Sequence, residues 1–396
     1  MPARAKEILS FFSAKRIAIP VIIGLGVATY LLISSLSEPT FIEAKNNKGH
    51  YEWIDHNKDG LQEIEEFVKV PAGGGGYNKL TYKEVLSSIN WTWYSTFWMF
   101  IALLMMATRD IAYMYRIRIL TDNQISWRRS FDVIMLWEFA SAITPSIVGG
   151  SGIALYILNR EGISVGRSTA VVMITAFLDE LFYILMVPTI LLIIGLTNLF
   201  PVELQTEIFG VTLGTKGIFV AGYFFILALT GIIIYAVFFN PRGFKWILLT
   251  IFKIRFLKKW RYHAIKIGDD IIITSRELKN KPFNFWLRAF LATFFSWTAR
   301  YWVVNFLILA FTTVLAYDHL LIYARQLVMW IIMLISPTPG SSGVAEFMFS
   351  GFFKEFIPFG LAAGLAVIWR LASFYPYLFI GAAILPVWFR RVYKKK

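Results

Sequence analysis

Long runs without charged residues constrain this chain more than any other feature of its sequence. Gly217 to Phe239 contains no Asp, Glu, Lys or Arg. A helix that rises 1.5 Å per residue crosses a hydrocarbon core of about 30 Å in about 20 residues. Over the whole chain, 57% of 396 residues are hydrophobic and the mean hydropathy is +0.60. The sequence therefore predicts an all-α fold, a polytopic integral membrane helical bundle.

The apolar runs predict about six membrane spans. The first run is too long for the core of a signal peptide and lacks a clear small-residue cleavage site, so we interpret it as a span. The six predicted spans are residues 17–36, 91–118, 168–196, 217–239, 283–316 and 360–388.

Two stretches rich in Pro and Gly resemble each other and interrupt the apolar pattern. Ile143 to Ala154 reads ITPSIVGGSGIA, and Ile335 to Ala345 reads ISPTPGSSGVA. Pro and Gly interrupt helices and leave backbone N–H and C=O groups without their helical partners. In hydrocarbon these groups need hydrogen bonds from other parts of the protein or from water in a cavity. We therefore predict two re-entrant helix hairpins, 131–158 and 319–355, whose breaks line a substrate cavity. The residues expected to line it are Pro145, Gly149, Gly150, Gly152, Pro337, Pro339, Gly340 and Gly343.

The distribution of Lys and Arg predicts the orientation. Positive residues favour the cytoplasm, and they are concentrated in both terminal segments and in residues 240–282. Both termini are therefore expected in the cytoplasm, with the protein in the cytoplasmic (inner) membrane as a multi-pass protein. The first hairpin would then enter from the cytoplasm and the second from outside, so that the two halves form inverted repeats. The predicted segments are 1–37 (tail and first span), 38–90 (outer loop), 91–200 (first half), 201–282 (linking span and basic segment) and 283–396 (second half).

Charged residues inside the apolar segments are the candidate substrate site. A charge at the centre of a membrane helix costs about 2.5–3.5 kcal/mol on insertion scales, so it is usually paired or faces water. The candidates are Arg109, Asp110, Glu138, Asp179, Glu180, Arg300, Arg325, Glu346 and Arg370. Internal ion pairs that fix helix register would explain any one of them. Together they predict a polar cavity in which arginines attract an anionic phosphate and carboxylates balance the charge.

The positions of these charges also repeat. An offset of 191 residues, which aligns Gly152 with Gly343, places Asp179 on Arg370. Both residues fall near the middle of their predicted spans, and we expect them to pair. The same offset places Arg109 on Arg300.

The second Pro/Gly stretch resembles a signature of a known family, the membrane domain of lysylphosphatidylglycerol synthetases and its stand-alone, flippase-like relatives. Residues 337–346 read PTPGSSGVAE, similar to Pro-x-Pro-Gly-Gly-x-Gly-x-x-Glu, and residues 144–162 look like the counterpart in the first half. Ser341, Ser342 and Ala345 depart from that pattern. The resemblance covers about residues 91–390 and implies a helical bundle with inverted halves that moves lipid headgroups across the bilayer. No aminoacyl-transferase domain is recognised, so the resemblance does not imply lysyl transfer.

The outer loop contains an independent motif, DHNKDGLQEIEE at residues 55–66. Its oxygen-bearing residues and its Gly60 have the spacing of an EF-hand loop, whose six to eight hard ligands suit Ca²⁺. The ligands would be Asp55, Asn57, Asp59, Leu61, Glu63 and Glu66. We expect one weak site for about 0.1–1 mM extracellular Ca²⁺, structural or regulatory. The alternative is a solvated acidic turn.

Residues 242–266 interleave aromatic and basic side chains. Such a helix is expected to lie on an anionic membrane leaflet, so membrane lipids are the expected partners. Nucleic acid is not an expected partner, because orientation in a membrane already explains the net charge of +14. A homo-oligomer is left open.

We predict a lipid translocase that exposes a midplane headgroup site to each side in turn. A secondary transporter of a small anionic solute is the alternative. A cavity open sideways to lipid would favour the translocase, and a closed aqueous vestibule the transporter. A membrane-embedded lipid-modifying enzyme ranks third, because the four histidines are dispersed over loops and no catalytic triad is recognisable. We therefore expect no enzymatic activity.

Overall fold

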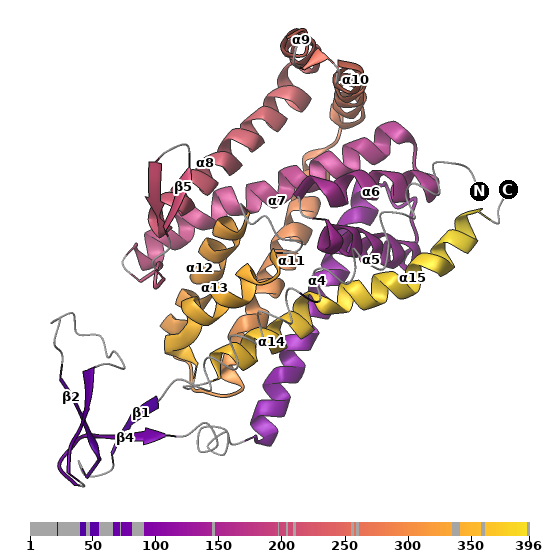
Figure 1. Cartoon of the computed structure of the whole chain (residues 1–396). Coiled ribbons are helices and arrows are strands. Elements are labelled where there is room, and N and C mark those ends of the chain that lie inside the picture. Colours follow the sequence, from indigo (N-terminus) through magenta and orange to yellow (C-terminus); the bar gives the residue numbers. More distant parts are fainter. Residues whose placement is uncertain are drawn as a thin grey trace.

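The computed structural model describes mainly helices (Figure 1). The described residues are 22, 40–44, 48–54, 66–71, 73–80, 91–144, 147–196, 198–202, 205–208, 211–254, 257–258, 261–334, 341–357 and 361–393. Within them, four helices are long and apolar enough to cross a membrane: Trp93–Leu120, Val165–Ile194, Thr215–Phe239 and Gly364–Tyr393. The prediction of an all-α polytopic membrane protein is confirmed. The first predicted span, 17–36, lies outside the described residues except for Ile22.

The helices follow one another in two similar series. The first series is α4 (Trp93–Leu120), α5 (Trp127–Ile143), α6 (Ile147–Arg160) and α7 (Val165–Ile194). The chain continues through α8 (Thr215–Ile234), its π-helical end η3 (Tyr235–Phe239), α9 (Pro241–Ile251) and α10 (Arg261–Leu278). The second series is α11 (Phe283–Leu309), α12 (Ala316–Met333), α13 (Val344–Phe353), the 3₁₀ turn η6 (Lys354–Phe356), α14 (Ala362–Ser373) and α15 (Tyr375–Tyr393).

The two series pack against each other as equivalent partners. At the offset of 191 residues, α4 corresponds to α11, and these two helices make the most extensive helix–helix contact of the described residues. They run antiparallel, because Trp98 stacks on Phe306 near one end while Arg288 donates to the Tyr115 hydroxyl near the other. In addition α5 packs on α15, and the equivalent α12 packs on α7. Inverted halves would produce this arrangement.

The first Pro/Gly stretch contains a shorter break than we predicted. Helix α5 ends at Ile143, and the Thr144 hydroxyl donates to Ala140 O, which satisfies a carbonyl at the helix end. The chain is helical again from Ile147, so Gly149, Gly150 and Gly152 belong to α6 rather than to a loop. A Cβ on Gly150 would lie 2.0 Å from the Ser141 Oγ atom, so this glycine lets α6 pack closely on α5. Pro145 lies outside the described residues.

The second stretch ends in a glycine with a positive φ. Gly343 has φ +87°, a conformation that favours glycine, and α13 begins at the next residue. Pro337, Pro339 and Gly340 lie outside the described residues, so their predicted place in a cavity is untested.

The predicted span 360–388 is interrupted, which we did not expect. Helix α14 ends at Ser373 and α15 begins at Tyr375. Pro376 explains the interruption, because proline has no N–H to donate to the preceding turn and disfavours the helical conformation of the residue before it. Beyond it, a Cβ on Gly381 would lie 2.3 Å from Phe139 Cβ, so α15 approaches α5 closely at this point.

The outer loop contains strands, which the sequence did not lead us to predict. They are β1 (Thr40–Glu43), β2 (Tyr51–Trp53), β3 (Phe67–Lys69) and β4 (Tyr77–Leu80), an antiparallel sheet of order β1-β4-β2-β3. A second pair, β5 (Gln205–Ile208) and β6 (Val211–Gly214), precedes α8. Phe41 stacks on Phe67 with ring centroids 4.1 Å apart, so aromatic pairs across strands hold the first sheet.

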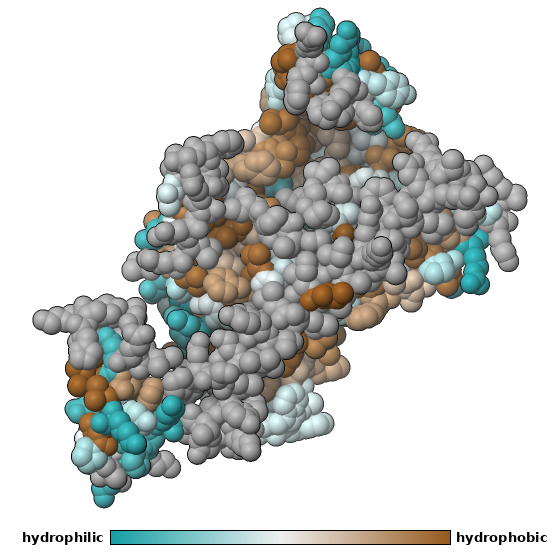
Figure 2. Space-filling model, viewed as in Figure 1, coloured by the Kyte–Doolittle hydropathy of each residue, from teal (hydrophilic) through white to brown (hydrophobic). Residues whose placement is uncertain are grey.

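The surface is divided in the way a membrane protein requires. Hydrophilic residues gather over α9 and α10 at one end and over the first sheet at the other (Figure 2). Between these ends, large apolar side chains are exposed along α4 and α8, among them Phe97, Phe100, Leu103, Phe224 and Phe225. A soluble protein rarely exposes apolar patches of this extent, so this middle region is suited to contact with lipid.

Candidate functional site

The interior of the bundle contains a series of buried arginines, and most of them are paired. Arg109 on α4 is 1% exposed. Its guanidinium donates to Glu138 Oε1 on α5 at 2.6 Å, to Asp110 Oδ1 at 2.8 Å and to the Tyr377 hydroxyl on α15 at 2.7 Å. These charge-assisted bonds join α4, α5 and α15. Because Asp110 and Glu138 both face the single guanidinium of Arg109, the cluster of these three residues has a net charge of −1 when all three are ionised.

Arg116, two turns further along α4, pairs with Asp179 on α7. The Arg116 Nη1 atom lies 2.5 Å from Asp179 Oδ1, and it also donates to the Thr293 hydroxyl on α11 at 3.0 Å. Trp297 on α11 donates its indole N–H to the same Asp179 oxygen at 2.8 Å. The pair therefore joins α4, α7 and α11, with neither charge left unmatched.

Tyr113 separates the two buried guanidinium groups on α4. The Arg109 guanidinium carbon lies 4.3 Å from the centre of the Tyr113 ring, and that of Arg116 lies 4.4 Å from it. Both distances are within the range of cation–π attraction. The ring keeps apart two positive charges that would otherwise repel each other.

The second half contains a third pair, between Glu346 on α13 and Arg370 on α14. Glu346 is fully buried, and its Oε1 accepts from Arg370 Nε at 3.0 Å. Its Oε2 accepts from the backbone N–H of Gly343 at 2.7 Å. The glutamate therefore caps the start of α13 and holds Arg370 at the same time. This geometry explains why the stretch Gly343-x-x-Glu346 needs both residues.

The expected pair between Asp179 and Arg370 is wrong. Asp179 is paired with Arg116, and Arg370 with Glu346 and the Ser342 hydroxyl at 3.2 Å. The repeat places the two residues at equivalent positions, but equivalence between halves does not require contact. Asp179 pairs with a residue of the first series of helices, and Arg370 pairs with a residue of the second series.

Arg325 makes contacts that join parts of the bundle, and its expected attraction of a phosphate stays a prediction. Its guanidinium on α12 donates to Asn198 O at 2.8 Å, to Phe352 O at 2.9 Å and to Glu355 Oε1 at 2.8 Å. These bonds tie α12 to the chain after α7 and to the end of α13. They occupy donors that a phosphate would need.

Arg300 is the exception among the predicted arginines. It lies on α11, is half-buried, and makes no ion pair or side-chain hydrogen bond with any described residue. Its guanidinium carbon lies 5.4 Å from the centre of the Trp297 ring. It is also near enough to Arg370 for the two cations to repel each other. Because Glu346 already matches Arg370, the region around Arg300 has one positive charge in excess.

Glu180 is a second exception. It lies on α7 beside Asp179 and is 8% exposed. Its Oε2 atom is buried and has no hydrogen-bond partner, and no described residue forms an ion pair with it. The remaining predicted carboxylates, Asp110, Glu138, Asp179 and Glu346, each have an arginine partner.

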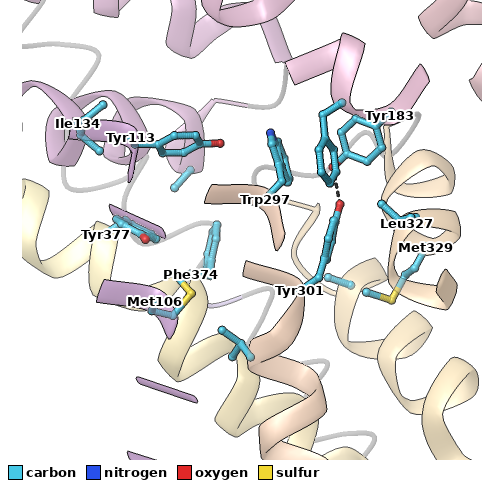
Figure 3. Packing of buried hydrophobic residues seen from close by; sticks show 14 of the residues in the cluster. Met106, Tyr113, Ile134, Tyr183, Trp297, Tyr301, Leu327, Met329, Phe374 and Tyr377 are labelled. Carbon is cyan, nitrogen blue, oxygen red and sulfur yellow. Dashed lines mark hydrogen bonds between the residues drawn. The ribbon is translucent and has the colours of Figure 1, made fainter. Parts of the chain in front are cut away.

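Aromatic side chains gather in the same interior, where Figure 3 shows Trp297 beside Tyr183 and Tyr301. Tyr183 on α7 and Tyr301 on α11 share a hydrogen bond between their hydroxyl groups, and the Tyr183 ring stacks on Trp330 of α12 at 3.9 Å. Trp297 lies beside them and contacts both tyrosines. Arg300 and the pair of Arg116 with Asp179 therefore share Trp297, one through its ring and the other through its N–H.

The residues that end the first-half signature connect α6 to the last helix. Gly162 has φ +99° and terminates the turn after α6. Glu161 accepts from the Trp388 indole N–H at 2.7 Å and pairs with Arg391, both on α15. Sequence reasoning missed this contact and also the roles of Arg116, Trp297 and Tyr377. Arg116 carried a usable signal, because it is a further charge within the predicted span 91–118.

Most of the predicted calcium loop lies outside the described residues. Asp55, Asn57, Asp59, Leu61 and Glu63 lie outside the described residues. Glu66 is buried, and its Oε2 accepts from the Trp53 indole N–H at 2.8 Å. Because Trp53 ends β2 and Phe67 begins β3, the loop connects two paired strands rather than two helices. No group of three metal-binding side chains was found among the described residues, and the site stays a prediction.

Comparison with known proteins places these features in a family. Residues 78–381 match the family described as "Lysylphosphatidylglycerol synthase TM region". A relative described as a UPF0104 membrane protein, from Archaeoglobus fulgidus, is 25% identical over 318 residues, which are 77% of this chain and 89% of the relative. No solved structure matches the chain.

The pairing of Arg116 with Asp179 can be measured by a double-mutant cycle. Removing one member of a buried ion pair costs about 3–5 kcal/mol, because the other charge stays buried without a partner. Arg116→Met and Asp179→Asn should each lower the melting temperature in lipid–detergent micelles, and the double variant should be more stable than the sum of the two losses implies. The cycle of Asp179→Asn with Arg370→Met is the control and should be close to additive. If only the control cycle of Asp179 with Arg370 showed coupling, the observed pairing of Arg116 with Asp179 would be contradicted.

Calcium binding by the outer loop can be tested without disturbing the sheet. Glu66 supports Trp53, so we choose Asp55→Ala with Asp59→Ala, which removes two predicted ligands. We expect calorimetric titration to show one site with a dissociation constant of about 0.1–1 mM in the unaltered protein and none in the double variant. Equal titration curves would refute the assignment.

Proposed function

We propose that this chain, which belongs to the lysylphosphatidylglycerol synthase TM region family, moves phospholipids from one leaflet of the cytoplasmic membrane to the other. The family supports a role of a membrane protein in lipid handling. The finer statement, translocation of a headgroup through the bundle, is our inference from the charges inside it.

The observation that carries the proposal is the excess positive charge at Arg300. A guanidinium without a protein partner is costly inside a bundle that faces lipid, so an anionic ligand would stabilise it. The phosphate group of a phospholipid has the charge and the planar pair of oxygens that arginine binds with two hydrogen bonds. The buried Trp297 ring lies within cation–π range of the guanidinium and leaves its hydrogen-bond donors available to a ligand.

The group around Arg109 supports the same substrate class. Asp110 and Glu138 together exceed the charge of Arg109 by one, and their side chains are 21% and 23% exposed. An ammonium group would match that excess. An anionic headgroup could match only the positive charge at Arg300. A zwitterionic headgroup could match that charge with its phosphate and the negative charge of the Arg109 group with its ammonium.

The alternative function, transport of a small anionic solute, would use the same positive charge. The family match favours the lipid, whereas the exposed apolar side chains along α4 and α8 are expected in the bilayer with either substrate. Comparing a phospholipid with free inorganic phosphate in one assay separates the two functions.

We expect Arg300→Gln to reduce lipid movement at least tenfold while leaving the protein folded, because Arg300 makes no ion pair or side-chain hydrogen bond with the described residues. The assay is loss of headgroup-labelled lipid from one leaflet of reconstituted liposomes, over a panel of anionic and zwitterionic lipids. Arg288→Gln is the matched control, since it removes an exposed arginine from the same helix. Arg300→Lys should recover part of the rate.

Unchanged lipid movement in Arg300→Gln would contradict the proposal. Movement of inorganic phosphate but of no lipid would favour the solute transporter. Formation of a new lipid product by the purified protein would favour the enzyme.

The orientation completes the proposal. We infer that α9 and α10 lie at the cytoplasmic surface and the first sheet outside, because the two lie at opposite ends of the bundle (Figure 1) and carry the predicted charge bias. The outward face of α9 is apolar, with Trp246, Ile247 and Ile251 exposed, and basic residues flank it. Such a face fits an anionic leaflet. Its other face packs on α10, where Lys245 pairs with Asp269 at 2.6 Å.

Spin labels can locate this face, because the chain contains no cysteine of its own. A label on Ile251→Cys should be shielded from a water-soluble relaxation agent in vesicles that contain anionic lipid, and a label on Asn280→Cys, in the exposed turn after α10, should stay accessible. High salt should weaken only the electrostatic part of the effect. A label at residue 251 that is as accessible as the label at residue 280 would contradict the placement.

A further inference from the structure

Glu180 has a position that the proposed binding of a headgroup does not explain. Glu180 is a buried residue of α7, its buried Oε2 atom has no hydrogen-bond partner, and no described arginine or lysine pairs with it. The neighbouring Asp179 shows how this bundle normally treats a carboxylate, with a guanidinium, an indole N–H and a supporting hydroxyl around the pair. Glu180 has none of these.

Contacts made by residues before and after Glu180 on α7 show which part of α8 lies beside it. Phe177 on α7 packs on Phe238 of η3, and the Tyr223 hydroxyl of α8 donates to Ile184 O. Glu180 therefore lies between these two contacts, at the level of the C-terminal third of α8. At that level Thr230 is buried, and its hydroxyl also has no hydrogen-bond partner among the described residues.

The charged and titratable groups that contacts bring to this part of α7 come from several elements. They are Asp179 and Tyr183 on α7 itself, Arg116 on α4, Tyr223 on α8, Tyr235 on η3 and Tyr301 on α11. The charge that acts on Glu180 is the like charge of Asp179, whose own partner is Arg116. An ionised Glu180 would thus be desolvated, unpaired and close to another carboxylate.

A carboxyl group in this environment is less costly when it carries a proton. The neutral form needs no counter-ion, and its O–H can donate one hydrogen bond, whereas the ionised form needs partners that the described residues do not offer. The ionised form becomes accessible only when water or a cation reaches the group. Glu180 would therefore gain or lose its proton when the access of water to its carboxyl group changes.

We propose that Glu180 is a proton-binding site that takes up a proton from one side of the membrane and releases it to the other during the transport cycle. Uptake forms an O–H bond on the carboxylate with a proton from water, and release reverses it, so no oxidant, reductant or other reactant is needed. The coupling of this proton to lipid movement rests on the proposed function, whereas proton binding itself does not.

Proton binding is tested with a hydrophobic carbodiimide, which reacts with protonated carboxyl groups in apolar surroundings. In liposomes, the full chain should be modified at Glu180, as mapped by peptide mass spectrometry, and the modification should decrease as the pH is raised. Glu180→Gln should abolish it. Glu277→Gln, which alters a carboxyl group on α10 that is 41% exposed, should not affect it. Absence of modification at Glu180 in the unaltered protein, or modification independent of pH, would overturn the proposal.

Coupling is tested separately with a pH gradient imposed across the same liposomes. Labelled lipid should move faster in one direction of the gradient in the unaltered protein, and Glu180→Gln should lose this dependence. A rate in the unaltered protein that ignores the gradient would overturn the coupling. If no lipid moved under any condition, the proposed function would fail, and the carbodiimide result would still decide whether Glu180 binds a proton.

Discussion

The structure depends on one constraint, that a charge inside an apolar bundle needs a partner of opposite charge. Arg109 with Asp110 and Glu138, Arg116 with Asp179, and Arg370 with Glu346 satisfy it with short contacts. These ion pairs lie within one series of helices, and the neutral partners Tyr377, Thr293 and Trp297 connect two of them to helices of the other series. Hydrophobic contact alone would not fix this register, because lipid is as apolar as the helix surfaces.

Two residues depart from this rule, and the functional argument comes from the departure. Among the described residues, Arg300 has no anionic or hydrogen-bonding partner, and Glu180 is a buried residue without an ion pair. Had every charge been paired, the buried charges would be sufficiently explained by stability and register. The unmatched cation fits an anionic headgroup, and the unmatched carboxyl group fits a proton. In the transport cycle that we propose, Arg300 would bind the substrate and Glu180 would bind the coupled proton.

The sequence predicted the class of the fold and which residues carry buried charge, but not how the charges pair. Apolar runs and Lys/Arg bias are local signals, so the polytopic helical bundle followed from them, and the Pro/Gly stretches located the breaks near Thr144 and Gly343. The ion-pair partners could not be predicted from local signals, because most of them lie on different helices. Arg116 and Asp179 are 63 residues apart, and the internal repeat led to the wrong pair of Asp179 with Arg370. The glycines of α6 were taken for a loop because glycine favours loops, although close packing on Ser141 is an equally good reason for glycine in a helix. The strands of the outer loop were missed because each is only three or four residues long.

The central claim is that Arg300 binds the phosphate of a lipid inside the bundle, and the most direct test is to measure retained lipid. Native mass spectrometry of the protein released from mild detergent should show bound phospholipid on the unaltered chain and on Arg288→Gln. The claim requires that Arg300→Gln lose at least nine-tenths of that lipid under the same conditions while keeping its melting temperature. Equal lipid on both variants, with the bundle still folded, would contradict the account.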